Sequence, residues 1–505
     1  MLTYIVIALV TLFIYVKWQQ SYWERRGVPS LNFHFFFGHL TCLFFGRRSI
    51  GEMTLDRYSE TKKLGYKHAG FYYFWKPVYI PIDPTIIKHI MQQDSNHFSG
   101  HGMYHHPKDI LSMHLFALEG ERWRELRAKL TPAFTSGKIK MMFETVAEKT
   151  EDLKRAVDKL VDNEDGIAIK EICGDFTTDV IASCGFGTEC DSLTNPNNVF
   201  RIYGKKMIAP KLATFLMEVF IPWNLLGNLG FKETGRETSE FFINIVRQTI
   251  QSREQNEIYR NDFMHLLLQL KNHGTLSDCK KIDAASQKSQ GVITEEDIMA
   301  QCFVFFLAGF ETSSTNMTFA LLELAQHLDI QEKLRQEVDR VLAKHNGKFT
   351  YQSVAEMHYL EMVVNETLRK FPPVPIIPRI CTQTYQLPNS NVVIEKGTSV
   401  EIPVWGIHMD PDYYPDPDVF DPERFTEENK TKRKEELTFL PFGAGPRLCI
   451  GLRFGMLQSK VGLATLIRNF KFTLNKKTSL PLEMEHGVCT NTVKGSVWLN
   501  AIRIE

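Results

Sequence analysis

The sequence predicts a mainly α-helical fold with a small β-sheet region, preceded by a single N-terminal membrane anchor. Three observations lead to this prediction. An uncharged apolar run opens the chain, and aromatic and β-branched residues gather in a few short segments. From about residue 120 onward, apolar residues recur mostly with the spacing of helices. One of these helices is long and apolar on all sides, so we expect it to cross the middle of the fold.

Composition excludes several classes of protein. The chain has 505 residues, of which 43% are hydrophobic, enough for a large core. Lys+Arg and Asp+Glu both total 59, and no basic run is interleaved with aromatic residues, so we expect no nucleic-acid partner. The nine cysteines form no C-x-x-C pair, which argues against a disulfide framework and a structural zinc site. We therefore expect most of the chain to lie in a reducing compartment.

The N-terminal run from Leu2 to Val16 carries no charge. As a helix it is about 22 Å long, and the aromatic residues after it extend it toward the width of a bilayer. Lys17, Arg25 and Arg26 follow the run, which predicts that the remainder faces the cytoplasm. A cleaved signal peptide is the alternative, but a basic start and a small-residue cleavage site are both missing. We predict an anchor at residues 1–23, a short hinge at 24–29, and one domain over residues 24–505.

Strand signals occur in three parts of the chain. The first covers residues 65–85, the second residues 380–405, and the third the C-terminal residues 496–502. Residues 427–436 are rich in Lys and Glu and are expected to form a solvated loop. The apolar stretch 208–231 fits either a segment that dips into the membrane or an amphipathic core helix.

The long helix has a clear start signal. Thr294 and Asp297 resemble a capping box, and the helical pattern continues to about Gln326 without proline. Such a helix is about 50 Å long at ~1.5 Å per residue. A membrane span is the rival interpretation, but the polar residues Glu311 and Thr312 interrupt the apolar run too soon.

A single cysteine, Cys449, lies in the glycine-rich stretch 442–451, immediately before another helical pattern. Glycines let the backbone approach a bulky group closely, and N–H groups at the helix start favour a thiolate. Phe442 can cover the sulfur, and Arg447 can place a positive charge beside it. These features suit a thiolate that binds the iron of a flat cofactor. The simpler alternative is an ordinary buried thiol.

The middle of the long helix reads Ala308-Gly309-Phe310-Glu311-Thr312. Gly309 weakens a helix, so its presence needs a reason. The small residues Ala308 and Gly309 would allow a ligand to lie against the helix backbone. The alternative is a glycine that serves helix packing. An acid beside an alcohol gives a route for protons.

Five positions of the stretch 442–451 match the ten-residue signature Phe-x-x-Gly-x-Arg-x-Cys-x-Gly together, and this stretch resembles the cytochrome P450 family. The resemblance implies the cytochrome P450 fold, with haem b (iron protoporphyrin IX) as cofactor and Cys449 as its metal ligand. It also implies that Thr312 positions dioxygen, that Glu311 helps to deliver protons, and that Ala308 lies against the haem.

The resemblance further implies which residues bind the two haem carboxylates. Trp123 and Arg127 lie four apart, as in the family's propionate-binding helix, and Arg379 and Arg447 are the other partners. Arginine suits this role because its planar fork matches a carboxylate. His101 stands where relatives often carry arginine.

A third resemblance concerns the stretch 366–369, which contains Glu366 and Arg369 three residues apart. With Arg424 in the segment 422–425, these residues would form a charge triad of the family. Its expected role is structural.

The segments 131–138 and 261–267 resemble microsomal enzymes, and the insect detoxification group matches best. The implied activity is a monooxygenase that inserts one atom of O2 into a lipophilic small molecule. The implied electron donor is NADPH, through NADPH-cytochrome P450 reductase, with cytochrome b5 as a further candidate partner. The implied location is the endoplasmic reticulum membrane, with the catalytic domain in the cytoplasm. Xenobiotics, insecticides and endogenous hormones all fit the expected apolar pocket.

Two other functions remain as alternatives. A haem-thiolate isomerase or dehydratase would need no reductase, and such relatives tend to lose the acid–alcohol pair that Glu311 and Thr312 form here. A non-enzymatic haem sensor would not need Thr312 at all.

Overall fold

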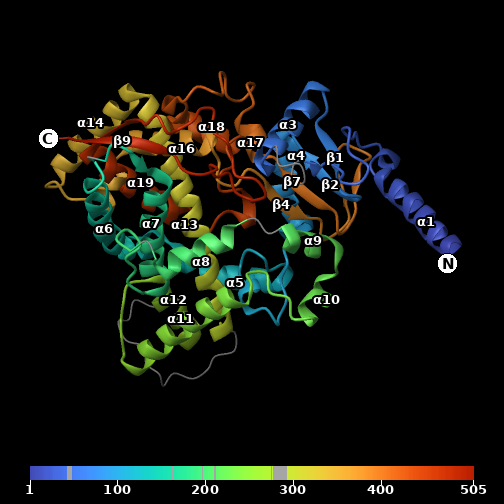
Figure 1. Cartoon of the computed structure of the whole chain (residues 1–505), viewed down its shortest axis with the longest axis horizontal. Helices are drawn as coiled ribbons and strands as arrows, with labels where there is room; N and C mark the ends of the chain where they lie inside the picture. Colours follow the sequence, from blue (N-terminus) through green and yellow to red (C-terminus); the bar gives the residue numbers. More distant parts are fainter. Residues whose placement is uncertain are drawn as a thin grey trace.

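Helices surround the long helix α13 (Glu295–Gln326) in the computed structural model of the chain (Figure 1). The structure describes residues 1–41, 48–161, 163–195, 197–209, 212–274, 276 and 293–504. The chain is mainly helical, with small sheets, as the sequence predicts. The β1–β2 hairpin and α3 lie toward the N-terminal end of the molecule, and most helices lie toward the other end (Figure 1).

The helices of the described residues fall along the whole chain. In order they are α1 (Leu2–Gln20), α3 (Ile50–Lys63), α4 (Pro84–Lys88), α5 (Gly120–Leu130), α6 (Ser136–Asp158), α7 (Ile169–Ile181), α8 (Val199–Ile208), α9 (Leu212–Phe220), α10 (Trp223–Asn228), α11 (Arg236–Gln255), α12 (Phe263–His273), α13, α14 (Leu328–Lys344), α15 (Tyr351–Ala355), α16 (His358–Lys370), α17 (Val404–His408), α18 (Glu427–Glu435) and α19 (Leu452–Asn469).

The strands form three small sheets. They are β1 (His68–Tyr73), β2 (Lys76–Pro81), β3 (Ile167–Ala168), β4 (Ile377–Ile380), β5 (Tyr385–Gln386), β6 (Val393–Ile394), β7 (Ser399–Ile402), β8 (Phe470–Leu474) and β9 (Trp498–Arg503). The largest sheet has the order β1-β2-β7-β4, with β2 and β7 parallel and the other pairs antiparallel. β3-β9-β8 and β5-β6 are antiparallel. Each of the three strand regions expected from the sequence therefore contains strands.

Helix α13 begins where the capping signal predicts. Thr294 accepts a hydrogen bond from the backbone N–H of Asp297, and the Asp297 side chain accepts one from the N–H of Thr294. The helix has 32 residues, about 48 Å at ~1.5 Å per residue. Of its 32 residues, 23 are buried, so it is the central helix of the fold.

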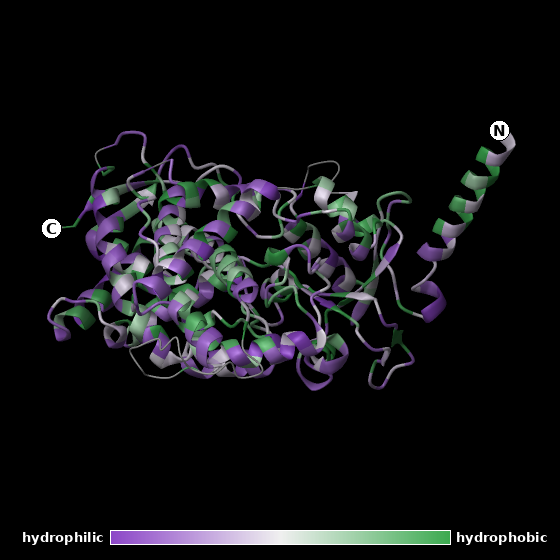
Figure 2. Cartoon of the chain, turned by 90° about the horizontal axis from the view of Figure 1, so that it is seen from below, coloured by the Kyte–Doolittle hydropathy of each residue, from purple (hydrophilic) through white to green (hydrophobic). Residues whose placement is uncertain are grey.

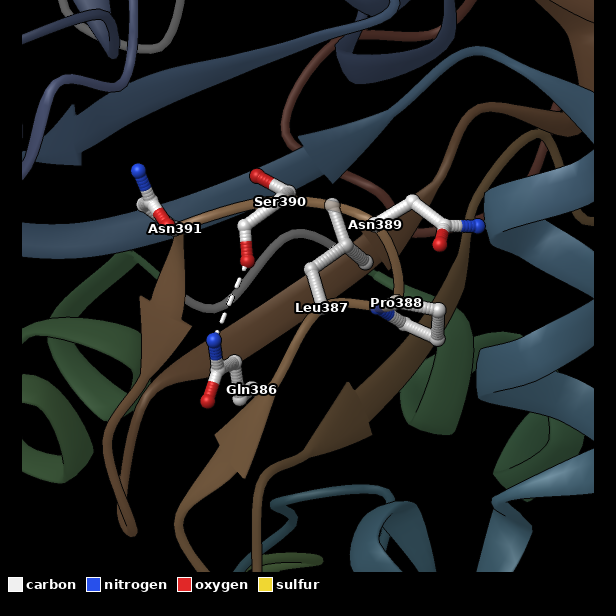
Figure 3. Close-up of a pocket in the computed structure, with 6 residues that line it drawn as sticks. All are labelled: Gln386, Leu387, Pro388, Asn389, Ser390 and Asn391. Atoms are coloured by element: carbon white, nitrogen blue, oxygen red, sulfur yellow. Dashed lines mark hydrogen bonds between the residues drawn. The ribbon is translucent and has the colours of Figure 1, made fainter.

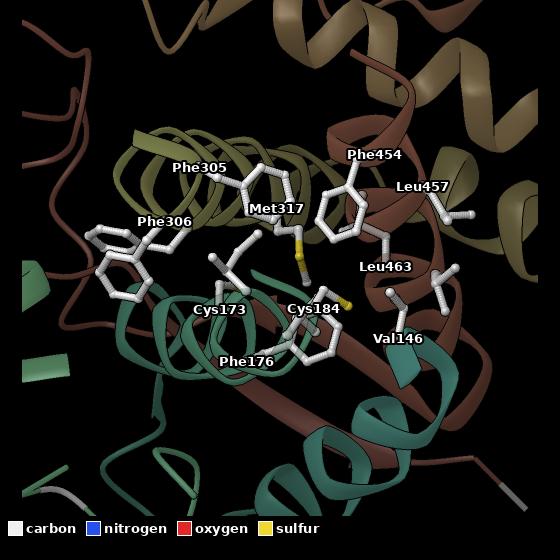
Figure 4. Close-up of a cluster of buried hydrophobic side chains, with 14 of the residues drawn as sticks. Val146, Cys173, Phe176, Cys184, Phe305, Phe306, Met317, Phe454, Leu457 and Leu463 are labelled. Carbon is white, nitrogen blue, oxygen red and sulfur yellow. The ribbon is translucent and has the colours of Figure 1, made fainter. Parts of the chain in front are cut away.

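The core forms where α13 meets α7 and α19. Figure 4 shows Phe305 and Met317 of α13 among side chains from α7, α19 and α6. A Cβ on Gly462 of α19 would lie only 2.5 Å from Met317 Cε and 2.9 Å from a ring carbon of Phe176. Glycine at this position thus lets α19 and α13 pack closely.

The charge triad expected from the sequence is present in the core. Arg369 donates to both oxygens of Glu366, at 2.8 and 2.7 Å, and both side chains are fully buried. Arg424 Nε lies 3.6 Å from Glu366 Oε1. The triad links α16 to the segment 422–425.

The N-terminal helix α1 extends away from the rest of the molecule, with apolar residues along its length (Figures 1 and 2). Among the described residues, one helical stretch, Leu2–Arg26, is long and apolar enough to cross a membrane. The last residue of the expected anchor, Trp23, and the expected hinge after it fold against the β-sheet, where the Pro29 carbonyl accepts from the Gly70 N–H at 2.7 Å. Trp23 is fully buried, donates to the Phe71 carbonyl at 3.0 Å, and lies where a Cβ on Gly70 would collide with it.

The stretch 427–436 is solvated, as expected, but it is not a loop. Residues 427–435 form helix α18, in which no side chain is buried. Thr426 caps the helix, with Glu427 and Glu428 in its first turn and Lys432, Arg433 and Lys434 in its last. Capping and charge placement of this kind stabilise a helix that has no apolar face, which is why periodicity alone missed it.

Candidate functional site

The glycine-rich loop before α19 brings Cys449 to the centre of the site. Its backbone N–H donates to the Phe442 carbonyl at 2.9 Å, which closes the loop. Gly445 has a φ of +69°, and a Cβ there would lie 1.8 Å from the Met91 carbonyl oxygen. The loop therefore requires glycine at this position, because any side chain would collide with the backbone of residues 91–92.

The Cys449 side chain is exposed although protein surrounds it closely enough to raise the pKa of its thiol by desolvation. Backbone N–H groups of Gly451 and Leu452 and the charge of Arg127 act in the opposite direction. The donors that the sequence led us to expect are present, but burial outweighs them. A metal ion bound to this sulfur would favour the thiolate over the thiol.

The positive charge that acts on the sulfur is that of Arg127, not that of Arg447. Arg127 donates to the Leu448 carbonyl at 2.8 Å, next to Cys449 in the chain. Arg447 points away and donates to the carbonyls of residues 99, 115 and 118. The sequence-based placement of Arg447 beside the sulfur was therefore wrong.

One face of α13 is not covered by protein side chains. Ala308 is exposed although its neighbours Phe305 and Phe306 are buried. Val304 and Thr312, one turn to either side of Ala308, are only partly buried. A face this open, in the middle of an otherwise buried helix, leaves room for a large apolar group.

Gly309 has a different role from the one expected of a ligand-facing glycine. A Cβ at this position would lie 2.5 Å from Ile181 Cδ1 of helix α7. Glycine here allows α7 and α13 to approach each other, so the packing interpretation is the right one. Ala308 is the small residue that opens the uncovered face.

Four of the predicted cofactor-binding residues lie together near the Cys449 loop. The Arg447 guanidinium stacks over the Trp123 ring, 3.8 Å from its centroid, and Arg127 projects from the same helix as Trp123. Burial and the nearby positive charge of Arg379 lower the pKa of Arg447 to about 9, against the opposing charge of Glu119. Burial alone lowers the pKa of Arg379 to about 10.

In the part of the chain that the structure describes, Arg127, Arg379 and Arg447 form no ion pair with a carboxylate. His101 stays neutral beside them, because burial and the charges of Arg379 and Arg447 hold its pKa well below the ordinary value. A buried cation without a counter-charge is costly, so the cluster fits a ligand that brings its own carboxylates. Haem has two, and the residues present therefore fit it.

Glu311, the predicted acid, is buried, with 8% of its surface exposed. Burial raises the pKa of its carboxyl, and the positive charges of Lys170 and Arg201 oppose that rise. Thr312 donates to the Ala308 carbonyl at 2.6 Å. No local sequence signal indicated Lys170 or Arg201, because they lie 141 and 110 positions before Glu311 in the chain.

A shallow hollow on the surface lies elsewhere, at the turn between β5 and β6 (Figure 3). It is lined by residues 386–391, and Gln386 donates to the Ser390 carbonyl at 3.2 Å across it. None of the predicted site residues lines it, so we assign it no function.

The site combines three features: an exposed cysteine, a helix face that protein does not cover, and arginines that pair with no carboxylate in the described residues. A haem-thiolate protein requires a sulfur ligand for the iron, space for the flat porphyrin, and cations for its carboxylates. Comparison with known proteins gives the same class.

The family model for cytochrome P450 matches residues 28–498. Probable cytochrome P450 6a13 of Drosophila melanogaster is 42% identical over 490 residues, which cover 96% of this chain and 95% of that protein. Cytochrome P450 6a2 of the same organism is 39% identical over 515 residues, with 100% and 99% covered. Cytochrome P450 6k1 of Blattella germanica is 40% identical over 485 residues, with 94% and 92% covered. This chain belongs to the cytochrome P450 family and binds haem.

Proposed function

We propose that the protein is a haem-thiolate monooxygenase that inserts one atom of O2 into a lipophilic small molecule. Electrons would come from NADPH through a flavoprotein reductase. The observation that carries the proposal is that two features occur together. The sulfur of Cys449 is exposed, and α13 has an uncovered face at Ala308, one turn before the acid–alcohol pair Glu311–Thr312. The substrate class follows from the apolar surroundings, since Phe305 and Val304 flank the open face.

In this proposal Cys449 is the metal ligand, and Phe442 and Ala308 bound the cofactor. Arg127, Arg379, Arg447 and the indole of Trp123 would hold the haem carboxylates. When bound, the haem supplies the chemistry that activates dioxygen. The chain's contribution is to fix the group, to exclude water, and to bring protons to it.

The proton route that we propose begins at Glu311. Its carboxyl is buried, with a pKa raised by desolvation, so it can hold a proton at the edge of the site. Thr312 can accept that proton and pass on its own, provided that its hydroxyl leaves the Ala308 carbonyl to which it donates.

We further propose that the protein sits on the endoplasmic reticulum membrane with its catalytic domain in the cytoplasm. The apolar helix α1 and the basic residues Arg25 and Arg26 after it support this orientation. NADPH-cytochrome P450 reductase would be the electron donor, with cytochrome b5 as a second donor.

Two outcomes of the same experiment separate this proposal from its alternatives. The protein is reconstituted with haem and reductase, and NADPH consumption is measured with a library of lipophilic compounds. A peroxide isomerase or dehydratase would act on its substrate without reductase, and a haem sensor would show no turnover. No NADPH consumption with any compound would overturn the monooxygenase proposal.

The ligand assignment is tested by Cys449→Ala. We expect the reduced carbon-monoxide difference spectrum to lose the band that a thiolate ligand gives. Cys489→Ala is the matched control, because Cys489 is the other exposed cysteine of the described residues. An unchanged spectrum in Cys449→Ala would exclude this sulfur as the ligand.

A further inference from the structure

The segment 114–118, which precedes α5, presents one exposed aromatic ring between two buried side chains. Phe116 is 43% exposed, whereas its neighbours Leu115 and Ala117 are buried. The His101 ring stacks on the Phe116 ring with 4.1 Å between centroids, and His101 Nδ1–H donates to the Phe116 carbonyl at 2.7 Å. A single exposed apolar side chain is common on proteins, so any role of this ring must follow from the way it is held.

The backbone of Leu115 is tied to two separate parts of the site. Its N–H donates to Gln301 Oε1 of α13 at 2.9 Å, and Gln301 is only 1% exposed. Its carbonyl accepts from Arg447 Nη1 at 3.3 Å, and Arg447 belongs to the loop that carries Cys449. These two hydrogen bonds fix the segment 114–118 between the central helix and the cysteine loop.

Gln301 lies on the same face of α13 as the uncovered stretch. Val304, Ala308 and Thr312 follow Gln301 by 3, 7 and 11 positions, which is the spacing of one helix face. Protein buries this face at Gln301 and covers it only in part from Val304 onward. Since Gln301 holds Leu115, the next residue, Phe116, lies where the covered part of the face gives way to the open part.

The Gln301 side chain uses only one of its two polar groups. Its Nε2 amide has no hydrogen-bond partner among the described residues, and its Oε1 accepts the Leu115 N–H. A buried donor without a partner destabilises the fold, and a methionine of similar length would fill the same space without one. The hydrogen bond to Leu115 is therefore the feature that glutamine supplies here and an apolar side chain would not.

We propose that Gln301 is a positioning residue for ligand recognition, which holds the segment 114–118 so that the Phe116 ring bounds the space beside the open face of α13. This inference rests on the proposed function, because it takes the open face as the ligand site. A ligand that meets an ordered ring does not have to order the segment itself, and this lowers the entropic cost of binding.

The main test compares two azoles that bind haem iron, imidazole and 4-phenylimidazole, in the haem-loaded protein. Their dissociation constants are measured from the shift of the haem absorption band. We expect Gln301→Met to weaken 4-phenylimidazole by about 3- to 10-fold, the range that one lost hydrogen bond gives, and to leave imidazole unchanged. Phe116→Ala should weaken 4-phenylimidazole at least as much. An unchanged ratio of the two constants in either variant would overturn the proposal.

Gln331→Met is the matched control. Gln331 of α14 is 3% exposed, and its Oε1 also accepts from a distant backbone N–H, that of Phe472, at 2.9 Å. The control thus removes the same kind of buried hydrogen bond away from the site and should leave both azole constants unchanged. Equal weakening in Gln331→Met and Gln301→Met would refute the positioning role, because general loosening of the fold would then explain the effect.

Gln301→Glu tests whether the acceptor itself is responsible. A carboxyl oxygen can accept the Leu115 N–H whether or not the group is ionised, so this variant should restore the affinity for 4-phenylimidazole. Failure to restore it would count against the hydrogen bond as the cause. Should Gln301→Met fail to fold, Gln301→Ala removes the same acceptor with a smaller side chain and is measured in its place.

Hydrogen exchange of the haem-loaded protein measures the segment directly, without any ligand. Peptides that cover residues 111–118 should exchange about 3- to 10-fold faster in Gln301→Met, because the Leu115 N–H loses its acceptor. The same peptides should be unaffected in Gln331→Met. Equal exchange in Gln301→Met and the unmodified protein would show that Gln301 does not hold the segment.

Failure of this inference differs from failure of the proposed function. Azole binding and hydrogen exchange need neither reductase nor NADPH, so both can give the expected result in a protein that has no monooxygenase activity. In that case the proposed function is wrong and the role of Gln301 stands. Normal NADPH-dependent turnover together with an unchanged azole ratio in Gln301→Met would leave the function intact and exclude the positioning role.

Discussion

The chain contains two groups of arginines that differ in their counter-charge. The first group is Arg369 and Arg424, and the second is Arg127, Arg379 and Arg447. In one group, Arg369 is fully buried and donates to both oxygens of Glu366 at 2.8 and 2.7 Å. In the other, Arg379 is 3% exposed, donates only to the Pro378 carbonyl, and has no carboxylate within ion-pair distance in the described residues. The first group is complete within the chain, and the second is complete only with an anion from outside.

The difference separates a structural role from a ligand-binding role without reference to any relative. A buried ion pair that satisfies its own hydrogen bonds fixes two elements to each other, here α16 and the segment 422–425. A buried arginine without a counter-charge destabilises the ligand-free protein, and binding of an anionic ligand removes that cost. Such an arginine therefore indicates a ligand-binding role. The predictions below test whether the two groups can be distinguished by stability and by haem retention.

The largest effect is expected from Glu366→Gln. This change leaves Arg369 buried and unpaired, and breaking a buried pair in this way costs about 3–5 kcal/mol. We expect the free energy of unfolding to fall by that amount whether or not haem is bound, as measured by denaturant unfolding. Glu423→Gln, next to Arg424 in the segment 422–425 but paired with Lys333 at the surface, should cost only about 0–1 kcal/mol. Equal costs would contradict the structural role of the triad.

A smaller effect on stability, but a clear effect on haem, is expected from Arg379→Leu. The change should weaken haem retention by about 10- to 100-fold, because one charge-assisted hydrogen bond to a carboxylate is lost. The haem-free protein should be no less stable than before, because a buried charge has been removed. Haem loss to a scavenger protein and unfolding of the haem-free form measure the two quantities.

Arg124→Leu is the control for Arg379→Leu. Arg124 lies beside Trp123 on α5, but it is 48% exposed and pairs with Glu121 at 3.1 Å. We expect haem retention to stay unchanged in this variant. A haem-free Arg379→Leu protein that unfolds much more easily than the unmodified one would place Arg379 with the structural group instead.

Signals that lie close together in the sequence predicted the structure well. The start of α13 follows from Thr294 and Asp297, which lie three residues apart and cap each other directly. The position of Cys449 before α19 follows from the ten residues around it. In both cases the residues that form the contact also form the pattern, so a local motif is sufficient.

Features that depend on distant contacts could not be predicted in this way. Gly309 packs against Ile181, and Lys170 donates to the Val493 carbonyl at 2.6 Å, although the two residues of each pair lie far apart in the chain. The direction of Arg447 is set by carbonyls of residues 99, 115 and 118, which a loop motif does not contain. Sequence motifs therefore identified which residues gather at the site, whereas the partner of each residue required the fold.

The smallest expected effect concerns Glu401, a carboxyl that resembles Arg379 in having no ion-pair partner among the described residues. Glu401 of β7 accepts a hydrogen bond from the Tyr73 hydroxyl at 2.6 Å. Burial raises its pKa from 4.5 to about 7. Between these two values the folded protein holds a proton that the unfolded chain releases, so stability should fall as pH rises from 4.5 to about 7 and then level off.

Glu401→Gln should remove this fall, which we expect to be about 1 kcal/mol because solvent screens a half-buried group. The comparison is made from unfolding curves of the unmodified protein and the variant at several pH values. Tyr73→Phe provides a test of opposite sign: without the hydroxyl that favours the ionised carboxylate, the fall should extend to higher pH. Parallel stability curves for the unmodified protein and Glu401→Gln would mean that Glu401 ionises as readily in the folded protein as in the unfolded chain. The absence of an ion-pair partner would then be no sign of a ligand-binding role in this fold.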